Sequence, residues 1–241
     1  MHLPTVGSTN AAAFEHHQSG ASAPFWITAD QQTAGKGRHG RLWQSPPGTL
    51  SVSLLLGDPA PLAQLPQLAY VTALAMADAV EDVTVSGLVQ LKWPNDLMID
   101  GAKLCGILME ARGAAQGQLV VIGAGVNCLT GPKDLPYRST SLLEQGFRVE
   151  PAILFAAFRQ AMAQRLDDWG RGENFAAIKT AWQQRAIGIG ANVTIELPLG
   201  RSISGTQLGL APDGRLRVRG SGDTEQLVSA GDLFFPQTEN E

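Results

Sequence analysis

Residues Leu91 to Glu110, "LKWPNDLMIDGAKLCGILME", contain two strand-like runs joined by a tight turn. Asp100-Gly101 is a strong hairpin signal, because both residues tolerate the positive φ angles that a two-residue turn requires. Strict alternation along the returning strand predicts that Lys103 shares a face with three apolar residues, which are Cys105, Ile107 and Met109. A lysine on such a face either extends toward solvent or meets an anion.

Polar side chains surround the proline that ends the first of these two runs. Lys92, Asn95 and Asp96 lie next to it in the sequence, which places them at one end of the predicted sheet. Gly106 on the returning strand has no side chain and permits a ligand to approach the backbone closely. Because ligands of open sheets bind near strand ends, this segment predicts a binding site.

A second glycine-rich segment, Gln31–Arg41 ("QQTAGKGRHGR"), combines three glycines with Lys36, Arg38 and Arg41. Its spacing does not match a Walker A phosphate-binding loop. Backbone freedom next to several cations nevertheless favours an anion such as phosphate, and a solvated basic turn is the alternative. Trp43 follows closely, and its ring could stack on a base.

The composition describes an ordinary globular protein with no general affinity for nucleic acid. The 241 residues are 44% hydrophobic and 17% charged, and acidic groups outnumber basic ones by 22 to 18, for a net charge of −4. A nucleic-acid-binding protein is usually basic. The apolar runs are too short to span a bilayer, no secretory signal is evident, and the two cysteines fit no metal site. We therefore expect a cytoplasmic protein.

The order of predicted elements indicates two domains. A helix after Ser8 or Thr9 as N-cap, strands on both sides of the glycine-rich loop, a long helix from Leu62 onward and two later helices form a mixed α/β region. From about Gly188 the chain changes to short alternating strands, typical of a small barrel or sandwich. We expect domains at 1–187 and 188–241. Three arginines on one strand face of the second domain, Arg215, Arg217 and Arg219, form either a solvated face or a contact for an acidic partner.

Taken together, "GSTN", "QQTAGKGRHGRLW", "LKWPNDLMIDGAKLCGIL" and "VVIGAGVN" resemble the motifs of the biotin–protein ligases in order and spacing. The terminal strands, with "GLAPDGRL" and "SAGDL", resemble the small SH3-like domain of that family. The resemblance implies an α+β fold: a mixed β-sheet with flanking helices, of the class II synthetase-like type that biotin and lipoate ligases share, and a small C-terminal SH3-like β-barrel. Because no helix-turn-helix segment precedes "GSTN", the chain resembles those members that lack a DNA-binding domain.

The resemblance also implies a reaction. The family uses ATP and Mg²⁺ to convert biotin to biotinyl-5′-AMP, and then transfers biotin to a lysine of a carrier domain, typically that of acetyl-CoA carboxylase. Matching motifs assign Lys103, Arg38 and Lys92 to catalysis and Asp96 to the metal. The implied biotin-binding residues are Ser8, Thr9, Asn10, Gln32, Lys36, Gly37, Arg38, Lys103 and Gly106. The implied ATP-binding residues are Lys36, Arg38, Arg41, Trp43, Lys92, Asn95 and Asn127.

Some features depart from the family, and rival interpretations remain. Lys36 and His39 stand where well-known members carry other cations, and a lysine lacks the two-pronged fork of an arginine. Lipoate–protein ligases share this architecture, so lipoate is the alternative substrate. A non-enzymatic RNA-binding protein is the rival from another class. We expect no DNA or membrane partner, a biotin carboxyl carrier protein as acceptor, and a homodimer as one possible assembly.

Overall fold

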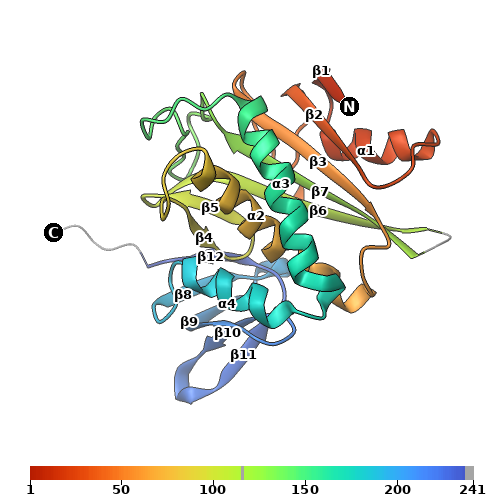
Figure 1. The fold of residues 1–241 in the computed structure, drawn as a ribbon. Coiled ribbons are helices and arrows are strands. Elements are labelled where there is room, and N and C mark those ends of the chain that lie inside the picture. Colours follow the sequence, from red (N-terminus) through yellow and green to blue (C-terminus); the bar gives the residue numbers. More distant parts are fainter. Residues whose placement is uncertain (115–116, 237–241) are drawn as a thin grey trace.

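A seven-stranded mixed sheet forms the centre of the protein in the computed structural model, which describes residues 1–114 and 117–236 (Figure 1). The strand order is β1-β2-β3-β7-β6-β5-β4. Only the β1–β2 pair is parallel, and the other neighbours pair antiparallel. The strands are β1 (His2–Val6), β2 (Phe25–Gln32), β3 (Thr49–Gly57), β4 (Gln90–Lys92), β5 (Asp96–Ile99), β6 (Ala102–Ala114) and β7 (Gly117–Asn127).

Helices cover both faces of this sheet. They are α1 (Thr9–Gln18), α2 (Leu68–Asp82), α3 (Pro151–Trp169) and α4 (Phe175–Arg185). One large core joins α2, α3 and α4 to one sheet face, and α3 buries Leu154, Phe158 and Met162 in it as its periodicity predicted. α1 packs in a separate apolar cluster on the other face. Ser8 is the N-cap of α1, but its side chain makes no capping hydrogen bond.

The long helix predicted from Leu62 begins later. Residues Leu62–Gln67 form a 3₁₀ helix instead, and α2 starts at Leu68. Pro66 explains the difference, because its ring disfavours α-helical geometry at the preceding residue and it has no N–H to donate to an α-helical hydrogen bond.

The register of β5 against β6 contains a bulge that changes the face of Lys103. Met98 pairs with Lys103 and Leu97 pairs with Cys105, so Leu104 is an extra residue on β6. Past the bulge Cys105 and Ile107 belong to the main core. Lys103 instead extends over Gly106, where a Cβ atom would lie 3.4 Å from Nζ. The predicted phase of Lys103 with Cys105, Ile107 and Met109 was therefore wrong, because a bulge shifts the alternation by one residue.

The C-terminal region forms a five-stranded antiparallel sheet in the order β11-β10-β9-β8-β12 (Figure 1). Its strands are β8 (Asn192–Glu196), β9 (Ser202–Leu210), β10 (Leu216–Arg219), β11 (Glu225–Val228) and β12 (Asp232–Phe234). The predicted arginine stripe, which runs from Arg215 just before β10 to Arg219 at its end, is neutralised locally. Its residues pair with Asp213, Glu225 and Asp223 in turn, which favours a solvated face over a contact for an acidic partner.

None of the helices in the described parts of the chain is both long and apolar enough to cross a membrane.

Candidate functional site

A cavity of about 250 Å³ opens on the face of the sheet that carries α1. Its lining combines the start of α1, the glycine-rich loop, the β4–β5 turn, β6, β7 and the first residues of β12. Fourteen of the residues predicted for the site line this cavity: Ser8, Thr9, Asn10, Gln32, Lys36, Gly37, Arg38, Arg41, Trp43, Lys92, Asn95, Asp96, Lys103 and Gly106. The structure therefore brings together segments that are far apart in the sequence.

Glycines on β6 and β7 make room for side chains above the sheet. Gly106 and Gly125 are paired in the register, and the Trp43 ring packs over both of them. A Cβ atom at Gly106 would lie 3.1 Å from the Trp43 ring, so a larger residue would displace the indole. The Asn10 amide packs in the same way against Gly123. These glycines allow side chains to approach the backbone closely, whereas the ligand contact predicted for Gly106 stays a prediction.

Hydrogen-bonded polar side chains line the α1 end of the cavity. Gln32 Oε1 accepts a bond from the Thr9 amide nitrogen at 2.8 Å and lies 3.1 Å from the Thr9 hydroxyl oxygen. The Ser53 hydroxyl lies 2.7 Å from Thr9 Oγ1 and 2.6 Å from Asn10 Oδ1. Glu110 accepts a 2.8 Å bond from Asn10 Nδ2. Because every member is held by a neighbour, this end of the cavity is rigid before any ligand enters.

Lys103 lies in the middle of the cavity. Its Nζ forms a 2.6 Å ion pair with Asp96 Oδ1. The rings of Trp43 and Tyr137 each have their centroids 5.6 Å from Nζ, which is within cation–π range. A cation held by one carboxylate and two aromatic faces is positioned to meet a second anion.

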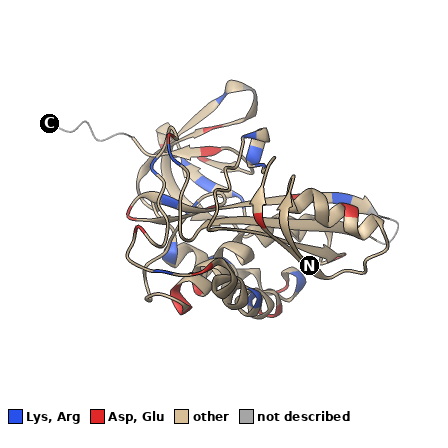
Figure 2. Ribbon diagram, turned by 90° about the horizontal axis from the view of Figure 1, so that it is seen from above, with Lys and Arg blue, Asp and Glu red and all other residues tan. Residues whose placement is uncertain are grey.

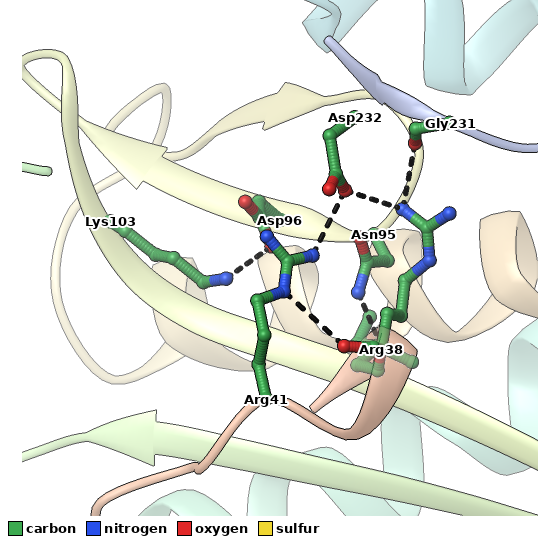
Figure 3. Close-up of polar contacts among 8 residues, drawn as sticks. Arg38, Arg41, Asn95, Asp96, Lys103, Gly231 and Asp232 are labelled. Carbon is green, nitrogen blue, oxygen red and sulfur yellow. Dashed lines mark hydrogen bonds and ion pairs between the residues drawn. The ribbon is translucent and has the colours of Figure 1, made fainter. Parts of the chain in front are cut away.

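Two arginines of the glycine-rich loop reach the C-terminal sheet (Figure 3). Arg38 Nη1 donates to the Gly231 carbonyl at 2.9 Å and lies 3.3 Å from Asp232 Oδ1. Arg41 Nη2 lies 2.9 Å from the same carboxylate oxygen. One carboxylate thus binds two cations of the loop, and the C-terminal sheet holds the loop over the cavity.

Burial shifts the pKa of two cationic groups in the site. Desolvation lowers the pKa of the Lys92 ammonium, an effect that Asp96 opposes and Lys103 reinforces. Desolvation also lowers the pKa of the Arg38 guanidinium, and the Asp232 charge opposes that change. Partly dehydrated cations interact with anions more strongly than exposed ones do, because less water screens them.

Asn127 is the predicted site residue that the structure does not place in the cavity lining. It is 1% exposed, and its Nδ2 donates to the Thr140 carbonyl at 2.9 Å. Sequence reasoning missed several residues in and beside the cavity. Tyr137, Arg138, Asp232 and Phe234 line the cavity, and Glu110 supports it from behind. Their signals are weak, because single aromatic or acidic residues in loops have no distinctive spacing.

Asp96 can serve a metal ion only together with ligands from a substrate. Within residues 1–114 and 117–236, no group of three or more His, Cys, Asp or Glu side chains could hold a metal. Mg²⁺ in nucleotide sites needs only one or two protein carboxylates, since phosphates and water complete its octahedron. The single carboxylate of Asp96 in the cavity fits an ion that arrives with a nucleotide.

Comparison with known proteins assigns the chain to a family. The family model "Biotin/lipoate A/B protein ligase family" matches residues 3–127, and "Biotin protein ligase C terminal domain" matches residues 188–235. A biotin–[acetyl-CoA-carboxylase] ligase of Paracoccus denitrificans is 34% identical, covering 97% of this chain and 99% of that protein. The chain belongs to the biotin–protein ligase family.

Further members of the biotin–protein ligase family match over most of the chain. The corresponding ligase of Mycobacterium tuberculosis is 34% identical, covering 95% of this chain and 85% of that protein. A solved structure of the Aquifex aeolicus biotin protein ligase in complex with biotin and ATP superposes with a TM-score of 0.79, with 25% identity and 97% of each chain covered. The match of a biotin-type C-terminal domain favours biotin over lipoate as substrate. The expected mixed sheet with flanking helices and the separate C-terminal β-sheet are confirmed.

Proposed function

We propose that this cavity carries out both steps of biotin transfer and that the residues around it have the roles given below. As a member of its family, the protein is an ATP-dependent biotin–protein ligase. The observation that supports these roles best is the convergence of Lys92, Lys103, Arg38 and Arg41 on one cavity that has polar acceptors at its α1 end. This arrangement suits a ligand with a polar head group at one end and phosphates at the other.

In the first step a carboxylate oxygen of biotin attacks the α-phosphorus of ATP, and the bond to the pyrophosphate leaving group breaks. Negative charge accumulates on the phosphoryl oxygens in the transition state. Lys103 neutralises this charge, and Lys92 and Arg38 bind the phosphates from the β4–β5 turn and the loop. Preorganised cations are the largest single source of such stabilisation. Trp43, whose ring lies beside Lys103, provides the aromatic face for adenine.

In the second step the neutral amine of a carrier lysine attacks the carbonyl carbon of the adenylate. AMP leaves with the bonding electrons, and the proton of the amine passes to a base or to water. The tetrahedral intermediate carries an oxyanion, and Lys103, held beside Asp96, Trp43 and Tyr137, is the cation that stabilises it. The loop covers the mixed anhydride between the two steps and keeps water away from it.

Asp96 would hold a Mg²⁺ ion that arrives with ATP, and the ion would supply charge neutralisation at the phosphates. Lys103, which pairs with Asp96 in this structure, would then be free to pair with the carboxylate of biotin. An Asp96→Asn variant, which keeps the shape of the side chain and loses its charge, should show a raised Mg²⁺ requirement in adenylate formation.

A biotin carboxyl carrier domain is the proposed acceptor, and mass spectrometry tests the whole function. The protein is incubated with a carrier domain, ATP and Mg²⁺, and either biotin or lipoate. A single biotin-sized mass increment supports the proposal. A lipoyl-sized increment, or none with either acid, contradicts it.

DNA is not a proposed partner of this chain. Its net charge is −4, and lysine and arginine are interspersed with aspartate and glutamate in the ribbon rather than gathered on one side (Figure 2). Since phosphate contacts supply most of the affinity for nucleic acid, a strong and salt-resistant complex is not expected. An electrophoretic shift of operator-like DNA that persists at physiological salt would contradict this prediction. The same measurement with RNA tests the alternative that the chain is a non-enzymatic RNA-binding protein.

A further inference from the structure

Glu110 has no part in the roles described so far, yet it terminates the polar chain at the α1 end of the cavity. It lies on β6, outside the cavity lining, and accepts a 2.8 Å bond from Asn10 Nδ2. Asn10 itself is 3% exposed, and a second, longer contact of 3.4 Å joins its Nδ2 to the Leu108 carbonyl. Both contacts of the amide nitrogen are therefore with β6.

The acceptor oxygen of Glu110 determines which end of the Asn10 amide faces each neighbour. A carboxylate only accepts hydrogen bonds, so the NH₂ group must face Glu110 and Oδ1 must face Ser53. The Ser53 hydroxyl has one proton and lies 2.6 Å from Asn10 Oδ1, which cannot donate. Ser53 therefore donates to Asn10, and the Thr9 hydroxyl, 2.7 Å away, gives its single proton to Ser53. Gln32 Oε1 then keeps the bond from the Thr9 amide nitrogen alone.

This proton order leaves acceptors at the cavity surface. Thr9, Asn10 and Gln32 line the cavity, and their oxygens still have lone pairs available. The amide nitrogens point to other partners, Asn10 Nδ2 to Glu110 and Gln32 Nε2 to Ser45 at 3.2 Å. A ligand that ends in N–H donors complements such a surface. The ureido ring of biotin has two N–H groups, whereas the dithiolane ring of lipoate has none.

We propose that Glu110 is a positioning residue which orients the Asn10 amide, and through it the hydroxyls of Ser53 and Thr9, so that the cavity selects an N–H donor head group. This inference rests on the proposed function of the cavity. If the amide of Asn10 could rotate by 180° and exchange its nitrogen and oxygen, the cavity surface would offer a mixture of donors and acceptors. The Glu110 carboxylate would then lose the N–H donor that it accepts from. Such a loss weakens binding by roughly 10- to 100-fold.

Biotin binding to the intact protein, measured by calorimetry, tests the proposal. Glu110→Leu should weaken biotin binding about 10-fold or more, because Asn10 Nδ2 loses its short bond and keeps only the 3.4 Å contact with the Leu108 carbonyl. Glu110→Gln keeps a carbonyl acceptor at the same place and should bind within about 3-fold of the parent. The KM for ATP should not change in either variant. Glu15→Leu, an exposed glutamate on α1, is the matched control and should behave as the parent.

An exchange of the two groups tests the direction of the bonds. Asn10→Asp alone places two carboxylates against each other and should lose affinity for biotin. Adding Glu110→Gln supplies an amide donor and should recover part of that loss, which a purely structural role would not produce. Equal biotin affinity in Glu110→Leu and the parent overturns the proposal, as does failure of Glu110→Gln to rescue Asn10→Asp. If the parent itself binds no biotin, the proposed function fails instead.

Discussion

Lys103 is the residue on which the proposed mechanism depends most. Its ammonium is held between Asp96, Trp43 and Tyr137 at the centre of the cavity. Lys103→Ala should reduce adenylate formation about 10²- to 10³-fold, because one preorganised charge opposite a developing anion is lost. Pyrophosphate release reports the rate. Lys179→Ala on α4 serves as a matched control, and near-normal turnover of Lys103→Ala would remove the lysine from the mechanism.

For single residues, the sequence predicted which residues lie at the cavity better than it predicted where their side chains point. Asp100-Gly101 forms the expected turn, and Lys103 meets an anion, the Asp96 carboxylate, in the cavity. Lys103 does not reach the cavity through the predicted alternation, because a bulge at Leu104 shifts the alternation of β6. This bulge depends on how β5 and β6 pair, and nothing in the neighbouring sequence indicates it. Asn127 looked equivalent to the other motif residues, but its amide is used by the Thr140 carbonyl. The contact of Glu110 with Asn10 joins residues that are 100 positions apart in the sequence.

Among the elements, the glycine-rich loop and β12 are joined by Asp232. If this contact keeps the loop over the adenylate, Arg38→Gly should let the intermediate escape, since it removes a cation and adds backbone freedom. Asp232→Ala should produce a smaller escape, because both arginines remain but lose their shared partner. Escape is measured as biotin on lysines of unrelated proteins mixed with enzyme, ATP and biotin.

The matched control for Asp232→Ala is Asp223→Ala, which removes an exposed ion pair with Arg219 in the same sheet. The amount of biotin on bystander proteins is compared between the two variants. If Asp232→Ala forms adenylate but labels bystander proteins no more than Asp223→Ala does, β12 has no role in holding the loop. Loss of adenylate formation in Asp232→Ala would also count against it, because the cavity cations are all retained.

Element existence followed well from periodicity, and element boundaries followed less well. The β5–β6 hairpin, the strands around the loop and the apolar stripe of α3 are where the pattern placed them. Because of Pro66, residues Leu62–Gln67 form a 3₁₀ helix, and α2 begins at Leu68 instead of Leu62. Strand β1, "HLPTV", was not predicted, since it is short, contains a proline and lies at the sheet edge, where its pairing with β2 rather than its own pattern defines it.

At the scale of the whole molecule, the cavity is completed by residues from both sheets. Asp232, Leu233 and Phe234 of β12 lie beside Arg38 and the β4–β5 turn. The sequence indicated two domains near Gly188, but it gave no sign that the second one closes the site of the first. Such a contact depends on how the two domains pack, and it joins Arg38 to a residue 194 positions later.

A ligand that fills this cavity should therefore slow the hydrogen exchange of backbone amides next to the cavity and in β12 together. Hydrogen exchange measured with biotin and ATP present should slow at the loop amides of Gly35–Arg41 and, at the same time, at Gly231–Phe234. The physical reason is that Arg38 and Arg41 bind Asp232, so ordering the loop reduces local opening of β12. Strand β10, which is absent from the cavity lining, is the internal control and should exchange as before. In Asp232→Ala the loop should still gain protection from the phosphates, but β12 should not. If the loop is protected in the parent protein while β12 is unchanged, the two sheets act independently and the cavity closes from one side only.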